Sequence, residues 1–330
     1  MWQKRLTETL RQILFNHKTN ENWGIAKHEA ELKNRWFTPE SINLALDSWI
    51  DALNENEVQD WLSKYKLPTE IRPQTLGIVM AGNIPMVGLH DLLCGLIAGY
   101  RVRVKLSSDD EVLMKYLIEN LVKEMPELAG RIELSTDFKG LDMAIATGSN
   151  NSGRYFEYYF RHIPHLLRGH RNGVAVLSGN ETAEELLGLG HDIFDHFGLG
   201  CRNITHLKLP SGFEFSRLFE AWLPLADIIH HNKYANNYHY HRALLLMNLD
   251  KHLDNGFVVL KESTDIYSPV GVVGYSVYKN FDDVTAVLNE NENKIQVVCG
   301  DGFVPFGQAQ HPRLWDYADR VDTLNWLLQN

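Results

Sequence analysis

The sequence predicts an α/β protein with a mainly parallel sheet, divided into two lobes. Its 330 residues, 44% of them hydrophobic and 22% charged, suffice to bury one large core or two. From Leu76 onward, short apolar runs alternate with helical stretches, which is typical of βαβ units. Before that point the chain reads as helix only, so we expect a helical layer that packs against the sheet.

The helical layer is predicted over the first seventy residues. Thr38-Pro39-Glu40 is a favourable helix start, and the apolar residues after it recur on one face: Ile42, Leu46, Trp49 and Leu53. We expect residues 1–70 to pack on a first α/β domain of residues 71–170, which part of 300–330 joins. Residues 171–300 are then expected to form a second α/β domain.

The alternating region predicts its elements one by one. Strands are expected at residues 76–80, 102–106, 131–134, 143–146, 174–177, 206–209, 257–260, 270–278 and 295–298. Helices are expected at residues 86–98, 110–125 and 182–197, twice within 214–247, and at 281–288. The C-terminal tail is expected to return to the first lobe.

The composition excludes several classes of function. A formal net charge of −10 disfavours nucleic acid as a partner. The N-terminus has no apolar signal core, and polar residues interrupt the longest apolar stretch, 84–100, so we expect no membrane insertion. Three cysteines, odd in number and far apart, argue against a disulfide framework. We therefore expect a cytoplasmic protein with reduced thiols.

The first candidate for chemistry is Cys201. It follows Gly198-Leu199-Gly200 between a predicted helix and a predicted strand, where the backbone can expose a side chain. The charge of the neighbouring Arg202 favours the thiolate form that a nucleophile requires. The alternative is a buried structural cysteine, which position alone leaves open. Cys94 and Cys299 lie inside apolar runs, so we predict core positions for both.

A second candidate is Asn83, in the segment Met80-Ala81-Gly82-Asn83-Ile84-Pro85 where a strand turns into a helix. This order places Asn83 at the carboxyl edge of a parallel sheet, where ligands of such sheets bind. Its side-chain amide can donate a hydrogen bond to a developing oxyanion. Asparagine is also a favoured helix N-cap, and the sequence leaves both interpretations open.

Two further segments suit a phosphorylated ligand. Arg101, Arg103 and Lys105 alternate along one strand, so their side chains share a face, and Ser107-Ser108 follow. The alternative is a solvated edge strand. Thr147-Gly148-Ser149 ends another strand before a predicted helix, whose first amide groups can hold a pyrophosphate.

Two other patterns are not supported. No Gly-x-Gly-x-x-Gly sequence follows a predicted strand, so a conventional Rossmann phosphate loop is not expected. The stretch His230-His231-Asn232-Lys233, with His239 and His241 beyond it, matches no standard zinc spacing. Acidic co-ligands are also missing nearby, so we predict no metal site.

Taken in order, these segments resemble the aldehyde dehydrogenase superfamily, most closely its acyl-CoA and acyl-protein reductase branch, to which the fatty acid reductase of bacterial bioluminescence belongs. The similarity covers residues 75–330. It is carried by Gly82-Asn83-Ile84-Pro85, by residues 98–108, by Thr147-Gly148-Ser149, by residues 198–203, by residues 265–270, and by Pro305-Phe306-Gly307-Gln308 with Asp316-Tyr317-Ala318-Asp319. The resemblance implies an aldehyde dehydrogenase-like fold, with a Rossmann-type cofactor domain and an α/β catalytic domain.

The resemblance also implies a role for each matching residue. Cys201 becomes the nucleophile, and Asn83 contributes to the oxyanion hole. Lys105, with Ser107 and Ser108 after it, binds the cofactor ribose. Gly148 and Ser149 lie near the pyrophosphate, whereas Asp265 and Tyr267 belong to the segment that holds the nicotinamide ribose.

Departures from the family pattern are informative. Aldehyde-oxidising members carry a glutamate that activates the hydrolytic water, but the stretch 166–171 reads Leu-Leu-Arg-Gly-His-Arg and has no carboxylate. Without that base, the acyl-enzyme thioester is hydrolysed more slowly and persists until hydride reduces it. Ser108 stands where NAD-preferring relatives often have glutamate, which favours NADPH. Tyr100 replaces an asparagine and Asp265 a glutamate, and both changes bear on cofactor binding.

The predicted function is therefore NADPH-dependent reduction of an acyl thioester to an aldehyde through an acyl-Cys201 intermediate. NADH is the alternative cofactor. The substrate is expected to be an acyl-CoA or an acylated carrier or partner protein, and a homodimer is compatible with the resemblance. Two alternative functions remain open: an aldehyde-oxidising dehydrogenase, and a relative that transfers acyl groups or is not catalytic and binds no nicotinamide.

Overall fold

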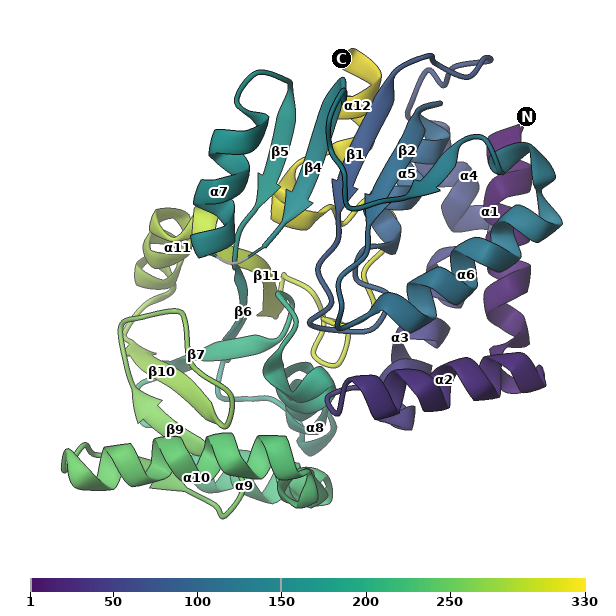
Figure 1. Ribbon diagram of the computed structural model, residues 1–330. Helices are drawn as coiled ribbons and strands as arrows, with labels where there is room; N and C mark the ends of the chain where they lie inside the picture. The colour runs from purple at the N-terminus through teal and green to yellow at the C-terminus, as the bar shows by residue number, and fades with distance from the viewer. Residues whose placement is uncertain (1, 149) are drawn as a thin grey trace. The chain divides into compact units, whose positions relative to one another are not determined.

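The computed structural model describes residues 2–148 and 150–330, and the chain divides into two compact units (Figure 1). Unit 1 is Met1–His170 with Pro312–Asn330, and unit 2 is Arg171–His311. Among the described residues, no helix combines the length and apolar character that a membrane crossing requires.

Unit 1 begins with a layer of helices, as the sequence predicts. They are α1 (Trp2–Phe15), α2 (Glu21–Lys33), α3 (Pro39–Ala52) and α4 (Glu55–Leu62). The side chain of Thr38 caps α3 by accepting a hydrogen bond from the Ser41 amide, and Pro39 opens the first turn. The buried face of α3 joins one core with α1, with the sheet of unit 1 and with the C-terminal tail.

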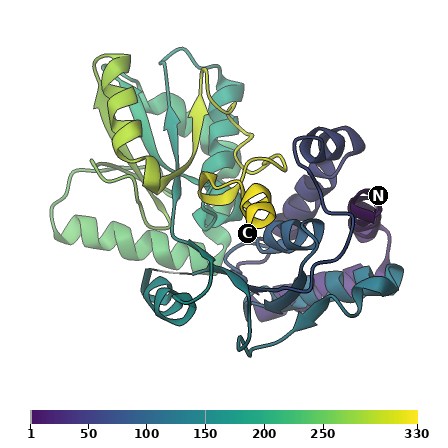
Figure 2. The same cartoon turned by 90° about the horizontal axis from the view of Figure 1, so that it is seen from above.

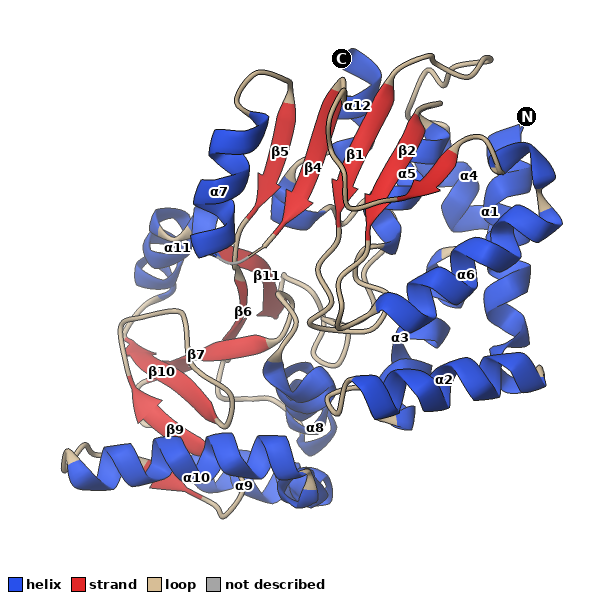
Figure 3. Ribbon diagram, viewed as in Figure 1, coloured by secondary structure: helices blue, strands red, loops and turns tan. Residues whose placement is uncertain are grey.

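The sheet of unit 1, sheet A, is entirely parallel (Figure 3). Its strands are β1 (Thr75–Val79), β2 (Arg101–Lys105), β3 (Ile132–Leu134), β4 (Met143–Thr147) and β5 (His165–Arg168), in the order β3-β2-β1-β4-β5. Strand β5 is not predicted by the sequence, because its four residues are too short to show a period. From β1 the chain builds the sheet first toward β3 and then toward β5, so the topological switch point lies between β1 and β4.

The faces of sheet A are covered by α5 (Leu89–Ile97), α6 (Glu111–Glu124) and α7 (Asn150–Phe160). Helix α5 begins three residues later than predicted, because Met86 takes a positive φ of 60°. Its amide donates to the Asp110 carboxylate at 2.7 Å, which holds this turn in place of a helical start. Asp110 is buried, and its burial raises the carboxyl pKa well above the ordinary value.

The C-terminal tail returns to unit 1, as expected. Its helix α12 (Thr323–Gln329) packs beside α5, as Figure 2 shows. Tyr100 donates a hydrogen bond from its hydroxyl to the Leu327 carbonyl at 2.9 Å, and Arg72 donates to the carbonyls of Leu327 and Leu328. Trp61 and Tyr65 hydrogen-bond the Tyr317 hydroxyl. Buried polar contacts therefore fix the tail along its length.

Unit 2 contains a second, mixed sheet, sheet B (Figure 3). Its strands are β6 (Asn172–Val176), β7 (Ile204–Pro210), β8 (Leu253–Asp254), β9 (Val259–Glu262), β10 (Val272–Tyr278) and β11 (Ile295–Gly300), in the order β11-β6-β7-β10-β9-β8. Only β8, which the sequence analysis missed, pairs antiparallel. The helices are α8 (Ala183–Phe194), α9 (Phe215–Trp222), α10 (Asn232–Met247) and α11 (Phe281–Glu290).

Helix α8 leads into the turn that carries Cys201. Thr182 and Glu185 form a reciprocal capping box at its start. The helix ends at Phe194 and not at Phe197 as predicted, because the backbone turns left-handed at His196 and Phe197. The chain then reaches Cys201 through a tight turn and enters β7.

Candidate active site

Cys201 occupies the turn between α8 and β7 and is half-buried, so it does not lie in a sealed core. Cys94 and Cys299 are fully buried, as predicted for both. Burial also raises the pKa of the Cys299 thiol, which suits a packing role. Cys201 is thus the one cysteine of the three that a substrate can approach.

The buried side chain of Asn203 fixes the shape of the Cys201 turn. Its Oδ1 accepts a hydrogen bond from the Gly200 amide at 2.8 Å. Its Nδ2 donates to the carbonyl oxygens of Asp192, Ile193 and Asp195, the last at 2.6 Å. The Asn203 side chain therefore connects Gly200, the residue before the cysteine, to the C-terminal end of α8. This role of Asn203 is not among those predicted from the sequence, although an asparagine two residues after a candidate nucleophile is a usable signal.

Replacing Asn203 by alanine is expected to lower the free energy of unfolding by about 1–3 kcal/mol, because it leaves buried backbone groups without partners. Urea unfolding measures this loss. Asn289→Ala, on the exposed side of α11, is the matched control and is expected to unfold like the wild type. Equal unfolding of both variants and the wild type would show that the Asn203 amide does not hold the turn.

The turn before Cys201 also stores backbone strain. His196 and Phe197 have φ values of 54° and 58°, in the left-handed region that costs energy for residues other than glycine, and Gly198 follows at 75°. The ring of Phe197 stacks on His231, with ring centroids 4.2 Å apart. Such strain persists only where surrounding contacts over-determine it, and it concentrates at functional sites.

Asp192 and Arg202 support the turn from the segment that follows β11. Asp192 is buried and accepts hydrogen bonds from the amides of Gly307 and Ala309, at 2.7 and 2.9 Å. Burial raises the pKa of its carboxyl to about 6. Arg202 donates to the Ala309 carbonyl at 2.6 Å. The Arg202 guanidinium therefore anchors this segment, a contact that the sequence analysis did not anticipate.

The segment around Asp265 lies at the same end of sheet B as Cys201. Thr205, at the start of β7, donates to the Ile266 carbonyl at 2.8 Å. His206 lies 2.9 Å from the Asp265 carbonyl, and since a carbonyl only accepts, its Nδ1 carries the proton. Asp265 and Tyr267 are both exposed, and one carboxylate oxygen of Asp265 accepts the Tyr267 amide at 3.2 Å. The fold thus places Cys201, Asp265 and Tyr267 at the end of sheet B where β7 begins.

Acid is expected to destabilise the protein through His196 and His206. Both are buried, and desolvation lowers the pKa of each to about 4. Between pH 6.5 and 4 the unfolded imidazole binds a proton that the folded one does not, so stability falls as pH falls. We expect a loss of roughly 2 kcal/mol for each histidine at pH 5 relative to pH 7.5. Urea unfolding of wild type and of His206→Asn at both pH values measures it. A wild type equally stable at both would contradict the expectation.

In unit 1, the predicted oxyanion donor and the predicted phosphate- and ribose-binding residues lie at the carboxyl edge of sheet A. Asn83 follows β1, is exposed and stands six residues before α5, whose N-cap is Gly88. The N-cap interpretation of Asn83 is therefore wrong. A Cβ at Gly82 would lie 2.6 Å from Ser107 Oγ, so the loops after β1 and β2 touch here. Lys105 and Ser108 are exposed at the same edge.

The cationic face of β2 is only partly available. β2 lies between β3 and β1, so the edge-strand interpretation is wrong. Arg103 donates to Glu133 on β3 at 3.0 Å and to the Lys139 carbonyl. Arg101 and Lys105 are exposed on the same face, and Lys105 is the one that reaches the carboxyl edge.

Gly148 directly follows β4, at the other side of the switch point. A Cβ there would lie 2.9 Å from Ser152 Cβ in the first turn of α7, so only glycine allows this approach of strand and helix. Ser149, the other predicted pyrophosphate residue, lies outside the described residues. A glycine between a strand and a helix start, beside the switch point and at the sheet edge that Lys105 also reaches, fits a dinucleotide.

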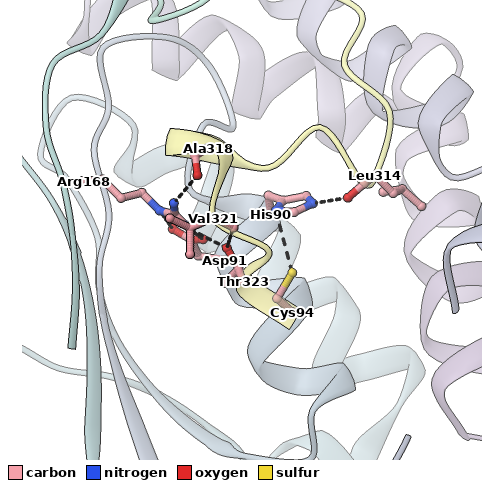
Figure 4. A network of polar contacts seen from close by, with 8 residues as sticks. All are labelled: His90, Asp91, Cys94, Arg168, Leu314, Ala318, Val321 and Thr323. Carbon is pink, nitrogen blue, oxygen red and sulfur yellow. Dashed lines mark hydrogen bonds and ion pairs between the residues drawn. The ribbon is translucent and has the colours of Figure 1, made fainter. Parts of the chain in front are cut away.

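Arg168, in the stretch 166–171 that lacks a carboxylate, is a buried structural residue (Figure 4). Its guanidinium makes two hydrogen bonds to the Asp91 carboxylate, at 2.7 and 3.1 Å. It also donates to Thr323 Oγ1 and to the Ala318 carbonyl. These bonds join β5 to α5 and to the tail. The guanidinium is a donor only and has no lone pair with which to accept a proton. Arg168 cannot serve as a general base.

Two other residues that the sequence singled out, Tyr100 and His231, have structural contacts. Tyr100 precedes β2, at the end of sheet A opposite to Lys105, and its hydroxyl binds the C-terminal helix. Its replacement of asparagine therefore does not bear on the carboxyl edge. The ring of His231 accepts a hydrogen bond from the Tyr234 amide and caps α10. Across the described residues, no group of three or more His, Cys, Asp or Glu side chains could hold a metal ion.

Comparisons with solved structures agree on the architecture. No protein-family model and no curated protein matches the sequence. An NAD-dependent aldehyde dehydrogenase from Sinorhizobium meliloti superposes with a TM-score of 0.66 over 90% of this chain and 69% of that one, at 14% identity. The chain has the aldehyde dehydrogenase-like fold.

Two further structures with this aldehyde dehydrogenase-like fold give the same picture. ALDH21 from Physcomitrella patens, solved with succinate, has a TM-score of 0.63 at 14% identity, covering 90% of this chain and 73% of its own. A Mycobacterium tuberculosis aldehyde dehydrogenase complexed with NAD+ has a TM-score of 0.61 at 13% identity, with 87% and 70% covered. The predicted fold class, with a Rossmann-type and a catalytic α/β part, is confirmed.

Proposed function

We propose that this protein reduces an acyl thioester to an aldehyde, with Cys201 as the covalent nucleophile and NADPH as the reductant. The observation that carries the proposal is the Cys201 turn. It is held by Asn203, strained at His196 and Phe197, and it exposes the one cysteine that is not fully buried. A rigid turn that presents a thiol at an element junction suits a nucleophile.

In the first step, the Cys201 thiolate attacks the carbonyl carbon of the acyl thioester. The new carbon–sulfur bond forms as the carbonyl oxygen becomes an oxyanion, for which we assign the Asn83 side-chain amide as a donor. The oxyanion then reforms the carbonyl and expels the CoA or carrier thiolate. Thiolates are adequate leaving groups, so this exchange requires no strong general acid beside Cys201.

When bound, the nicotinamide cofactor supplies the hydride that reduces the carbonyl of the acyl-Cys201 thioester. The resulting hemithioacetal on Cys201 collapses, which releases the aldehyde and restores the thiolate. For holding the cofactor we assign Lys105, Ser107, Ser108, Gly148 and Ser149 on the side of sheet A, and Asp265 with Tyr267 on the side of sheet B. Ser108 carries no charge that would repel a 2′-phosphate, which supports NADPH over NADH.

Arg168 supports the reductive direction. An oxidising enzyme must hydrolyse its acyl-cysteine, which requires a base that activates water. The stretch 166–171 offers a guanidinium locked to Asp91 and no carboxylate. An acyl-enzyme protected from water persists until it is reduced. Aldehyde oxidation stays the alternative function, and turnover of aldehyde with NADP+ in the absence of any acyl-CoA reduction would favour it.

The proposal is tested by incubating the protein with a long-chain acyl-CoA and measuring its intact mass. We expect the mass to increase by a single acyl group, which peptide mapping locates on Cys201 and not on Cys94 or Cys299. Adding NADPH is then expected to remove the adduct and release aldehyde. Absence of an adduct overturns the proposal, and an adduct that NADPH leaves intact favours an acyl-transferring protein that uses no nicotinamide.

A further inference from the structure

The loop that carries Asn83 is buried at both ends and exposed in its middle. It connects β1 to α5, and we name its residues 82–86 the Asn83 loop. Gly82, Pro85 and Met86 are buried, whereas Asn83 is exposed between them. A side-chain amide on such a loop keeps one position only when both ends of the loop are held by contacts with other segments.

The buried carboxyl of Asp110 holds one end of the Asn83 loop. Its Oδ2 accepts a hydrogen bond from the Met86 amide at 2.7 Å. Met86 has a φ of 60°, in the left-handed region that costs free energy for methionine. Such a conformation persists only where surrounding contacts over-determine it, and the fully buried Met86 side chain and the bond to Asp110 provide those contacts. Removing the Asp110 oxygen therefore frees this end of the loop.

The backbone of Asp110 holds the other end of the Asn83 loop. A Cβ at Gly82 would lie 2.9 Å from the Asp110 nitrogen and 2.6 Å from Ser107 Oγ, so the two loops are in direct contact. The Asp110 amide donates to the Ser107 carbonyl at 3.2 Å, which closes the turn before α6. Asp110 thus touches the Asn83 loop at both ends, once through its carboxyl and once through its backbone. A shift of this one residue moves the support of Asn83.

The Asp110 carboxyl serves the Asn83 loop and not its own helix. Asp110 is the N-cap of α6, where an aspartate side chain usually accepts a hydrogen bond from the first turn, but it makes no such bond. Its second oxygen, Oδ1, is buried and has no hydrogen-bond partner within the part of the chain that the structure describes. Desolvation raises the pKa of the carboxyl well above its ordinary value, which favours the neutral acid. A buried acid with one hydrogen bond is costly, so stability alone does not explain an aspartate here.

We propose that Asp110 is a positioning residue for the reaction at Cys201, because it holds the Asn83 amide in the place where the oxyanion develops. This inference rests on the proposed function and deepens the assignment of Asn83 in the same site. A donor stabilises an oxyanion most when it is already in place, since it then requires no rearrangement during the reaction. Asp110 is 3% exposed, so it acts through the Asn83 loop and does not touch the substrate.

The test measures the rate at which a long-chain acyl-CoA acylates Cys201, followed by intact mass in the absence of nicotinamide. Asp110→Ala removes the acceptor of the Met86 amide and is expected to slow acylation about tenfold or more, the effect of a misplaced catalytic group. Asp110→Asn keeps an oxygen that accepts this bond, and its amide is neutral like the buried acid, so its rate should stay within about twofold of the wild type. Asp109→Ala, at the exposed neighbouring position, is the matched control and should react like the wild type.

A double variant separates positioning from general structural damage. Asn83→Ala alone is expected to slow acylation about a hundredfold, as the loss of one oxyanion donor does. Adding Asp110→Ala should then slow it no further, because no donor remains to be positioned. If the two effects multiply instead, Asp110 acts independently of Asn83 and the proposal is wrong. Asp110→Leu fills the same space without an acceptor, so it takes the place of Asp110→Ala if the alanine variant does not fold.

The remaining outcomes distinguish this inference from the function on which it rests. If Asp110→Asn is acylated as slowly as Asp110→Ala, the acid acts through its proton and not through the Met86 contact, which overturns the proposal. Wild-type rates in Asp110→Ala and Asp110→Leu overturn it as well when Asn83→Ala is slow, and only this inference then fails. If Asn83→Ala itself reacts like the wild type, the assignment of Asn83 fails and this inference with it. If the wild type forms no acyl adduct on Cys201, the proposed function fails as a whole.

Discussion

Replacing Cys201 by alanine is expected to reduce aldehyde formation from acyl-CoA at least about a thousandfold, the scale typical of losing a covalent nucleophile. The proposed route passes through a bond to the Cys201 sulfur, and neither other cysteine can replace it because both are fully buried. The same variant should show no acyl adduct. NADPH consumption with a long-chain acyl-CoA, followed at 340 nm, measures the rate.

Cys94→Ala is the matched control for this prediction. It removes an equally small side chain from the core of unit 1, where Cys94 contacts only His90 among its polar neighbours that the structure describes. We expect this variant to retain the wild-type rate at 25 °C. If Cys201→Ala stays active while Cys94→Ala does not, the assignment of the nucleophile is wrong.

Replacing Arg168 by methionine is expected to lower the free energy of unfolding by about 3–5 kcal/mol, because it leaves the Asp91 carboxylate buried without its counter-ion. The side chains of Arg168 and Asp91 are only 5% and 12% exposed, so water compensates little. The change also removes donors from Thr323 Oγ1 and the Ala318 carbonyl, which loosens the tail. Urea unfolding at pH 7.5 measures the loss.

The double variant Arg168→Met with Asp91→Leu distinguishes the ion pair from simple packing. A buried pair can often be replaced by apolar residues with little cost, so the double variant should recover most of the lost stability. If it is as unstable as Arg168→Met alone, the bonds of Arg168 to the tail dominate instead. A single variant that unfolds like the wild type contradicts the structural role altogether.

Local pattern was enough to predict most of the elements and to single out Cys201 as the candidate nucleophile. The alternation from Leu76 onward predicted the parallel strands, because a buried strand and an amphipathic helix each leave a period in the sequence. The Gly-x-Gly segment before Cys201 predicted an exposed turn, because glycine marks tight backbone. The predicted ends of the helices were less accurate. Helix α5 begins after Met86 and helix α8 ends before His196, and both of these residues have a positive φ that local propensity does not predict.

What each polar side chain does depended on partners far along the chain. Tyr100 looked like a change in the cofactor site, yet it binds a carbonyl 227 residues away. Arg168 looked only like a missing glutamate, yet it forms an ion pair with Asp91, 77 residues earlier.

The sequence by itself determined the α/β architecture, the core cysteines and the candidate nucleophile, since these follow from periodicity and from residue type. Only the tertiary structure decided that Asn203 holds the Cys201 turn, that Arg168 is locked in a buried ion pair, and that the switch point of sheet A lies between Asn83 and Gly148. The physical reason is that a hydrogen bond or ion pair is satisfied by whatever group the fold brings within about 3 Å. That distance is set by how the elements pack, which the order of residues along the chain does not display.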